Sequence, residues 1–135
     1  MKMRKMNTTK KMVESGALAI VRADVERACE IADGLIKGGV PVMEMSYTFN
    51  TAGDVIKAFP ISDFYGPKLV KVFKTPIPDM PILASGGINL DNLSQWLENG
   101  VDVCGFGGLL TKGTSEEIAA NASKIHEIIT NFRNK

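Results

Sequence analysis

The sequence predicts an α/β fold with a parallel sheet, because short apolar runs alternate along it with segments of helical spacing. The first apolar run, Ala17–Val21, is too short for a helix and is typical of a strand buried on both faces. The following segment, 24–37, repeats apolar residues at helical spacing and ends at Gly38-Gly39. A chain of 135 residues with 44% hydrophobic content fits one globular domain.

The remaining expected elements continue this alternation. A polar helix over 6–16 precedes the first strand, and a second strand covers 40–47. Asn89 is expected to cap a helix that ends at Gly100, and Thr114 with Glu117 forms a capping box for the last helix. Further along the chain we expect a short helix over 68–74 and strands over 80–85 and 101–106.

The alternation breaks after the second strand. A parallel connection needs roughly a dozen residues including its helix, and 48–53 is too short to supply one. Segment 52–59 fits either a strand that stops at Pro60 or the helix that follows the second strand. If it is the strand, a segment is absent here, and 1–135 is a single α/β domain that is internally shortened near residues 49–54.

Composition excludes several classes of function. The net charge is +1, with 16 basic and 15 acidic residues interspersed, so nothing indicates binding to nucleic acid or an anionic membrane. No run approaches the length of a membrane span, and the basic N-terminus lacks the apolar core of a signal peptide. Cys29 and Cys104 lie in apolar patterns without metal-ligand spacing, which predicts reduced core residues in a cytoplasmic protein.

Lys57 is the first candidate for chemistry. It lies in a short apolar run, 54–59, which stops at Pro60. If this run is a buried strand, the apolar surroundings disfavour the ammonium form, and the lysine offers a free amine that can attack a carbonyl. The alternative is an ordinary lysine on a helix, which the same spacing also allows.

The strand pattern indicates two further candidate functional residues, both charged. Glu44 interrupts the strand over 40–47, and an ionised carboxylate in a buried strand is costly unless it is paired or employed. Arg22 ends the first strand and could bind a substrate carboxylate with its planar fork of donors. Each residue could instead lie at the surface, at a strand end.

Two glycine turns form a candidate phosphate site. Ser85-Gly86-Gly87 and 105–108, with Gly107 and Gly108, each follow a short apolar strand and precede a helix. Glycine lets backbone N–H groups approach an anion closely, and a helix N-terminus adds favourable potential. The alternative is a pair of plain tight turns. The second turn does not fit a dinucleotide-binding motif, because Leu110 stands where the third glycine would be.

These segments together resemble the bacterial 2-keto-3-deoxy-6-phosphogluconate (KDPG) aldolase family, which includes the 4-hydroxy-2-oxoglutarate (KHG) aldolases. The resemblance implies a (β/α)8 (TIM) barrel shortened to about five βα units, because the family's third to fifth units have no counterpart here. It also implies a lyase that needs no metal or other cofactor and is usually a trimer. The matching segments are 19–22, 38–48, 55–60, 66–67, 85–92 and 103–110.

The resemblance implies a class I aldolase. Lys57 would form a Schiff base with pyruvate, and Glu44 would act as general acid and base. The substrate would be 2-keto-3-deoxy-6-phosphogluconate, cleaved to pyruvate and glyceraldehyde 3-phosphate, or 4-hydroxy-2-oxoglutarate, cleaved to pyruvate and glyoxylate. The remaining implied roles are substrate binding by Arg22, Thr48 and Phe59, and phosphate binding by Ser85, Gly86, Gly87, Gly107 and Gly108. A non-catalytic fragment and a phosphate-binding barrel protein without Schiff-base chemistry are the alternatives.

Overall fold

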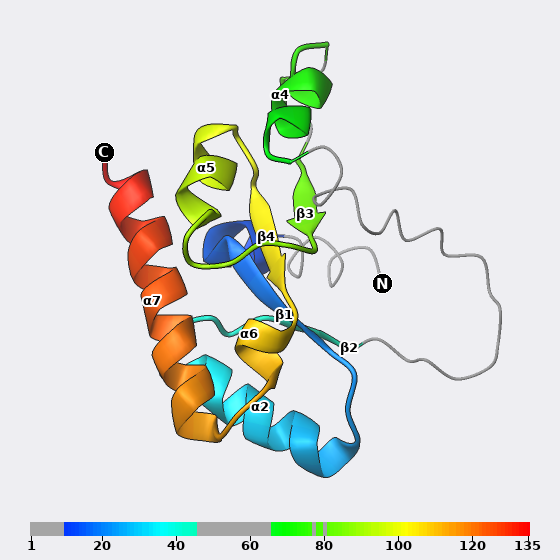
Figure 1. Cartoon of the computed structure of the whole chain (residues 1–135), viewed down its shortest axis with the longest axis vertical. Coiled ribbons are helices and arrows are strands. Elements are labelled where there is room, and N and C mark those ends of the chain that lie inside the picture. Colours follow the sequence, from blue (N-terminus) through cyan, green and yellow to red (C-terminus); the bar gives the residue numbers. More distant parts are fainter. Residues whose placement is uncertain (1–9, 46–65, 77, 80) are drawn as a thin grey trace, which may run out of the picture.

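A parallel four-stranded sheet forms the centre of the molecule, in a computed structural model that describes residues 10–45, 66–76, 78–79 and 81–135 (Figure 1). The strand order is β2-β1-β4-β3, and every neighbouring pair is parallel. The strands are β1 (Ala17–Val21), β2 (Met43–Met45), β3 (Leu83–Ser85) and β4 (Val103–Phe106). The predicted α/β class with a parallel sheet is thereby confirmed.

Helices alternate with these strands, as the sequence predicts. The long helices α2 and α7 pack against each other, and α5 packs against α7, all on the same side of the sheet (Figure 1). Residues 10–15 are also helical and lead into β1. The helices are α2 (Val25–Lys37), α4 (Lys68–Lys74), α5 (Leu93–Glu98), α6 (Gly108–Thr111) and α7 (Ser115–Arg133).

Local signals in the sequence set the ends of the two long helices. The Asp24 carboxylate accepts a hydrogen bond from the Arg27 backbone N–H at 2.9 Å, at the start of α2. Thr114 and Glu117 form the predicted capping box at the start of α7. Gly38 ends α2 where this helix lies against α7, and a Cβ there would be 2.2 Å from the Ala122 Cβ. Only glycine allows this close approach.

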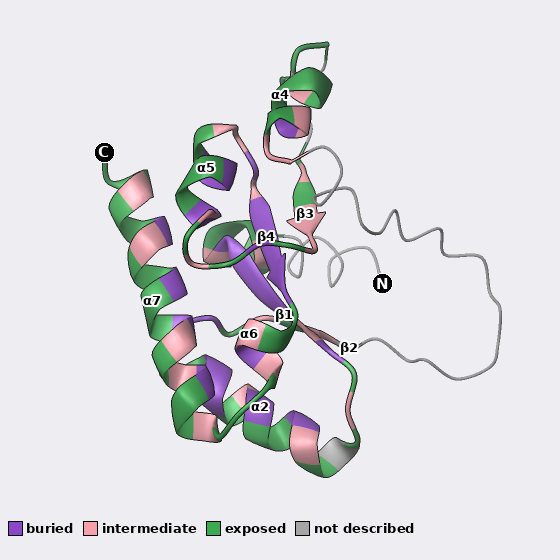
Figure 2. Ribbon diagram, in the orientation of Figure 1, coloured by how far each residue is buried: buried purple, intermediate pink, exposed green. Residues whose placement is uncertain are grey.

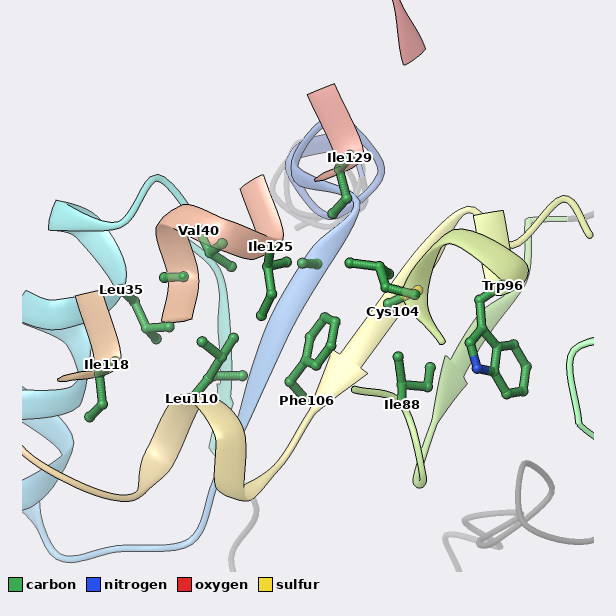
Figure 3. Packing of buried hydrophobic residues seen from close by; sticks show 14 of the residues in the cluster. Leu35, Val40, Ile88, Trp96, Cys104, Phe106, Leu110, Ile118, Ile125 and Ile129 are labelled. Atoms are coloured by element: carbon green, nitrogen blue, oxygen red, sulfur yellow. The ribbon is translucent and has the colours of Figure 1, made fainter. Parts of the chain in front are cut away.

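The core lies between the sheet and the helices that cover it. Figure 2 shows the buried residues on β1, on β4 and on the helix faces turned toward these strands. Phe106, from β4, is the largest fully buried side chain among the described residues, and Figure 3 shows it in the middle of the cluster. The other labelled members of this cluster are Leu35, Val40, Ile88, Trp96, Cys104, Leu110, Ile118, Ile125 and Ile129.

Several predicted boundaries differ from the structure. Asn89 does not cap a helix, because α5 begins four residues later with Asn92 at its N-cap. The Asn89 side chain instead accepts hydrogen bonds from the backbone N–H groups of Asp91 and Asn92, which forms a local turn before the helix. The short helix α6 after β4 was not expected. The two assignments considered for 52–59 lie outside the described residues, as does the expected shortening near 49–54.

The two cysteines differ in environment, which corrects one prediction. Cys104 is fully buried in β4, as expected, but Cys29 is exposed on α2 and is no core residue. The apolar spacing around Cys29 wrongly predicts burial, because a small side chain is tolerated at the edge of the apolar face of an amphipathic helix, where it can be exposed. Among the described helices, none is long and apolar enough to cross a membrane.

We expect a thiol reagent such as Ellman's reagent to modify one cysteine in the native protein at neutral pH. Burial raises the pKa of the Cys104 thiol to about 12, so this group stays protonated and is shielded, whereas the thiolate is the reactive form. Cys29 should react alone, and both thiols should react in denaturant. A Cys29→Ser variant should show no reactive thiol until it unfolds; rapid modification of that native variant would contradict the assignment.

Candidate functional site

The candidate site lies at the carboxyl edge of the sheet, the edge where all four parallel strands end. Arg22 follows β1 and is exposed, the turn 86–87 follows β3, and Gly107 follows β4. These positions are up to 85 residues apart in the sequence (Arg22 to Gly107), and the parallel pairing brings them to one edge. Ligands of α/β proteins commonly bind at this edge.

Glu44 lies on the face of the sheet that points away from the core. Strand register pairs it with Ile20 of β1, and laterally paired residues of a sheet point to the same face. A Cβ on Gly105 would lie 3.2 Å from the Ile20 Cδ1 and 3.0 Å from the Ser85 Cβ, which places these residues on that face as well. We call Ile20, Glu44, Ser85 and Gly105 the site face. The helix-packed residues Ala19, Val21, Cys104 and Phe106 occupy the opposite face.

The first glycine turn has a backbone that L-residues rarely adopt. Gly86 has φ 91° and Gly87 has φ 64°, so a side chain at either position would be strained. Ile88 follows and is buried in the core, which fixes one end of the turn. The side-chain amide of Asn92 donates to the Gly87 carbonyl oxygen at 2.9 Å, which fixes the other. The predicted turn is therefore held at both ends.

The second glycine turn is held in a similar way. The Gly107 carbonyl oxygen accepts hydrogen bonds from the Leu110 backbone N–H at 3.0 Å and from the Thr111 hydroxyl at 3.1 Å. Leu110 is fully buried, and the Arg27 guanidinium donates to the backbone oxygen of Thr111. A Cβ on Gly107 would meet no atom of the described residues within 4 Å, so they leave the space beside this backbone open.

Lys112 is a cation near the second turn that the sequence pattern did not single out. A Cβ on Gly108 would lie 3.4 Å from the Lys112 Cδ, so the lysine stem passes beside this glycine. Both residues line an open pocket of about 460 Å³ between α6 and α7, whose other lining residues are Leu109, Gly113, Glu117, Ala120 and Asn121. That pocket shares only Gly108 with the predicted phosphate residues, and the Glu117 carboxylate makes it unfavourable for a phosphate.

The structure brings together part of the predicted set. Arg22, Glu44 and the two glycine turns lie at the carboxyl edge or on the site face, whereas Thr48, Lys57 and Phe59 lie outside the described residues. Asn92 is a supporting residue that sequence reasoning missed. Its signal was present, because an asparagine three residues after Asn89 and five after Gly87 can reach back to a turn. Within the described ranges, no group of three or more His, Cys, Asp or Glu residues could hold a metal ion.

Comparisons with known proteins give one consistent relationship. No protein-family model matches the chain. The curated protein 2-dehydro-3-deoxy-6-phosphogalactonate aldolase from Escherichia coli (strain K12) is 27% identical over 112 residues, which cover 78% of this chain and 54% of that protein. A solved structure described as "Native KDPGal structure" matches with a TM-score of 0.52 and 29% identity, covering 57% of this chain and 38% of that chain.

The strand order agrees with this relationship. In a closed barrel the first strand pairs with both the second and the last strand, and β1 lies between β2 and β4, the last strand of this chain. The chain spans about half the length of the curated relative that it matches. Its fold is thus a shortened member of the (β/α)8 class, as predicted from the sequence, and both matches support the predicted resemblance to the KHG/KDPG aldolase family.

Proposed function

We propose that the protein is a class I aldolase that releases pyruvate from a 2-keto-3-deoxy sugar acid phosphate. The observation that carries this proposal is the convergence of Arg22, Glu44 and both glycine turns on one edge and face of the sheet. Such a substrate has a carboxylate, which the Arg22 cation could bind, and a phosphate, which the two glycine turns could bind. Glu44 is a carboxylate that could transfer protons during the reaction. The related E. coli aldolase supports the same class of reaction.

The proposed chemistry begins at Lys57. Its free amine attacks the 2-keto carbon, and loss of water from the carbinolamine leaves a protonated imine. The imine accepts the electron pair of the C3–C4 bond when that bond breaks, while Glu44 removes the proton of the C4 hydroxyl. Glyceraldehyde 3-phosphate leaves, the enamine takes a proton at C3, and water hydrolyses the imine to pyruvate and free Lys57. Arg22 and Thr48 would hold the pyruvate carboxylate, with Phe59 beside the imine.

The phosphate end of the substrate would lie between the two turns. We assign Ser85, Gly86, Gly87, Gly107 and Gly108 to this end, and the open space beside Gly107 supports the assignment. KDPG and a 2-keto-3-deoxy-6-phosphogalactonate are both substrates of this type. The smaller 4-hydroxy-2-oxoglutarate has no phosphate and would leave the two turns unused.

We further propose that 1–135 acts as one internally shortened domain in a homo-oligomer, with a trimer as the family's usual assembly. Apolar side chains that remain exposed support self-association, because another copy would cover them. Met43 of β2 is 39% exposed and Leu83 of β3 is 42% exposed, and these two strands are the edges of the described sheet.

Reductive trapping tests the proposed function directly. We expect pyruvate with borohydride to attach one pyruvate-derived group per chain, located at Lys57 by peptide mass spectrometry. The selectivity follows from protonation, because an exposed lysine near pKa 10.4 is almost wholly charged at neutral pH and cannot attack a carbonyl. A Lys57→Arg variant should lose both labelling and aldol cleavage, since arginine stays protonated.

The matched control is Lys71→Arg, the same substitution at an exposed position of α4. This variant should keep wild-type labelling and turnover. Labelling spread evenly over surface lysines would instead identify a non-catalytic fragment. Aldol cleavage without any trapped lysine would identify a barrel enzyme that uses no Schiff base.

A further inference from the structure

The side chain of Asn92 is hydrogen-bonded to the first glycine turn, and we call this interaction the clamp. Its Nδ2 donates to the Gly87 carbonyl oxygen at 2.9 Å, and its Oδ1 accepts from the Asn89 backbone N–H at 2.9 Å. The Asn89 Oδ1 in turn accepts from the Asn92 backbone N–H at 3.1 Å. Both ends of the Asn92 amide are therefore used, which fixes its orientation.

This clamp acts on backbone that needs external support. Gly86 and Gly87 have φ 91° and 64°, and glycine has more accessible conformations than any other residue. Buried Ile88 anchors the chain directly after the turn, one residue beyond Gly87. A hydrogen bond to the Gly87 carbonyl restricts rotation of the peptide group that carries it, and it therefore also restricts where the neighbouring N–H groups point.

We infer that Asn92 is a positioning residue for anion binding, holding the Gly86-Gly87 turn ready for the phosphate of the substrate. The inference rests on the proposed function, which assigns a phosphate to this turn. Both ends of the Asn92 amide are occupied, by Gly87 and Asn89, so we assign Asn92 no direct bond to the phosphate. Its effect is preorganisation: without the clamp, the turn must be ordered at the moment of binding, which weakens affinity.

The chain offers a matched control at the other end of the same helix. The Asn99 Nδ2 donates to the Gln95 carbonyl oxygen at 2.8 Å, which is also a side-chain amide bonded to a backbone oxygen. Asn92 and Asn99 flank α5 as its N-cap and C-cap. Asn99→Ala removes only its bond to Gln95, whereas Asn92→Ala removes the bonds to Gly87 and to Asn89. Of the two asparagines, Asn92 is the one that contacts the glycine turn.

Titration of the whole chain with inorganic phosphate, followed by the amide NMR signals of Gly86 and Gly87, tests the inference. In the wild type these signals should shift in a saturable way. Asn92→Ala should raise the dissociation constant about threefold to tenfold, as expected for the loss of the hydrogen bond that holds Gly87, whereas Asn99→Ala should leave it unchanged. Asn92→Asp keeps the acceptor for Asn89 but loses the donor, so it should weaken binding as well and serves if Asn92→Ala does not fold.

A kinetic measurement separates positioning from a general loss of stability. Asn92→Ala should raise KM for a phosphorylated 2-keto-3-deoxy sugar acid and leave KM for 4-hydroxy-2-oxoglutarate unchanged. Equal phosphate affinity in wild type and both Asn92 variants would overturn the inference and leave the aldolase proposal intact. A wild type that binds no phosphate at the turn would overturn both the phosphate assignment and the inference built on it.

Discussion

Phe106→Ala is expected to lower the free energy of unfolding by about 3–5 kcal/mol, as large-to-small substitutions of buried aromatic residues do. Phe106 is fully buried at the centre of the core, between the sheet and the helices (Figure 3). A domain of this size has a total stability of roughly 5–15 kcal/mol, so the variant should be close to unfolding at room temperature. Urea denaturation measures the change, with the single tryptophan, buried Trp96, as a fluorescent probe.

The same substitution at Phe73 is the matched control for this prediction. Phe73 lies on α4 and is 44% exposed, so Phe73→Ala removes little buried surface and should change the free energy of unfolding by less than about 1 kcal/mol. If both variants lost the same stability, the core would not be centred on β4. A change in the m value, the slope of the unfolding free energy against urea concentration, in Phe106→Ala alone would indicate a change in the compactness of the native or denatured state.

The sequence predicts the elements of this fold well where local signals act alone. The run at 17–21, the helix at 68–74 and the capping box at Thr114 are found where expected. Each depends on residues that are neighbours in the chain: apolar side chains without interruption, a Gly-Pro start, and a threonine with a glutamate three residues later.

Elements whose position depends on tertiary contacts were predicted less well. Asn89 resembles an N-cap in the sequence, but hydrogen bonding with Asn92 makes it part of a turn before α5. Cys29 fits an apolar helical pattern, yet the face that meets α7 leaves it exposed. Strand β3 is shorter than the apolar run that predicts it, because strand length is set by the neighbour with which the strand pairs.

In the candidate site, too, local signals were predicted and tertiary contacts were not. Residue types indicated which chemistry to expect at Arg22, Glu44 and the glycine turns, and parallel topology explains why they share an edge. The hydrogen bonds of Asn92 and Thr111 to the glycine turns were not predicted, because each joins a side chain to backbone whose path is known only after folding.

Glu44→Gln is expected to lower kcat about 10²–10⁴-fold, the usual contribution of a positioned general acid or base. Glutamine has nearly the same shape but cannot accept and return a proton, so the aldol cleavage step loses its proton acceptor. Glu44 is half-buried on the site face in the same row as Ile20, and this placement supports a role in proton transfer. Steady-state pyruvate release, coupled to lactate dehydrogenase, measures the effect.

Borohydride trapping distinguishes a loss of proton transfer in Glu44→Gln from a general loss of the site's structure. Imine formation at Lys57 can proceed with water as proton carrier, so Glu44→Gln should still accumulate the pyruvate adduct, more slowly than the wild type. Glu98→Gln, the same change on the exposed last residue of α5, is the matched control and should leave turnover and trapping unchanged. Wild-type kcat in Glu44→Gln would remove Glu44 from the mechanism, whereas loss of trapping with an intact thermal transition would make it a binding residue for the keto acid.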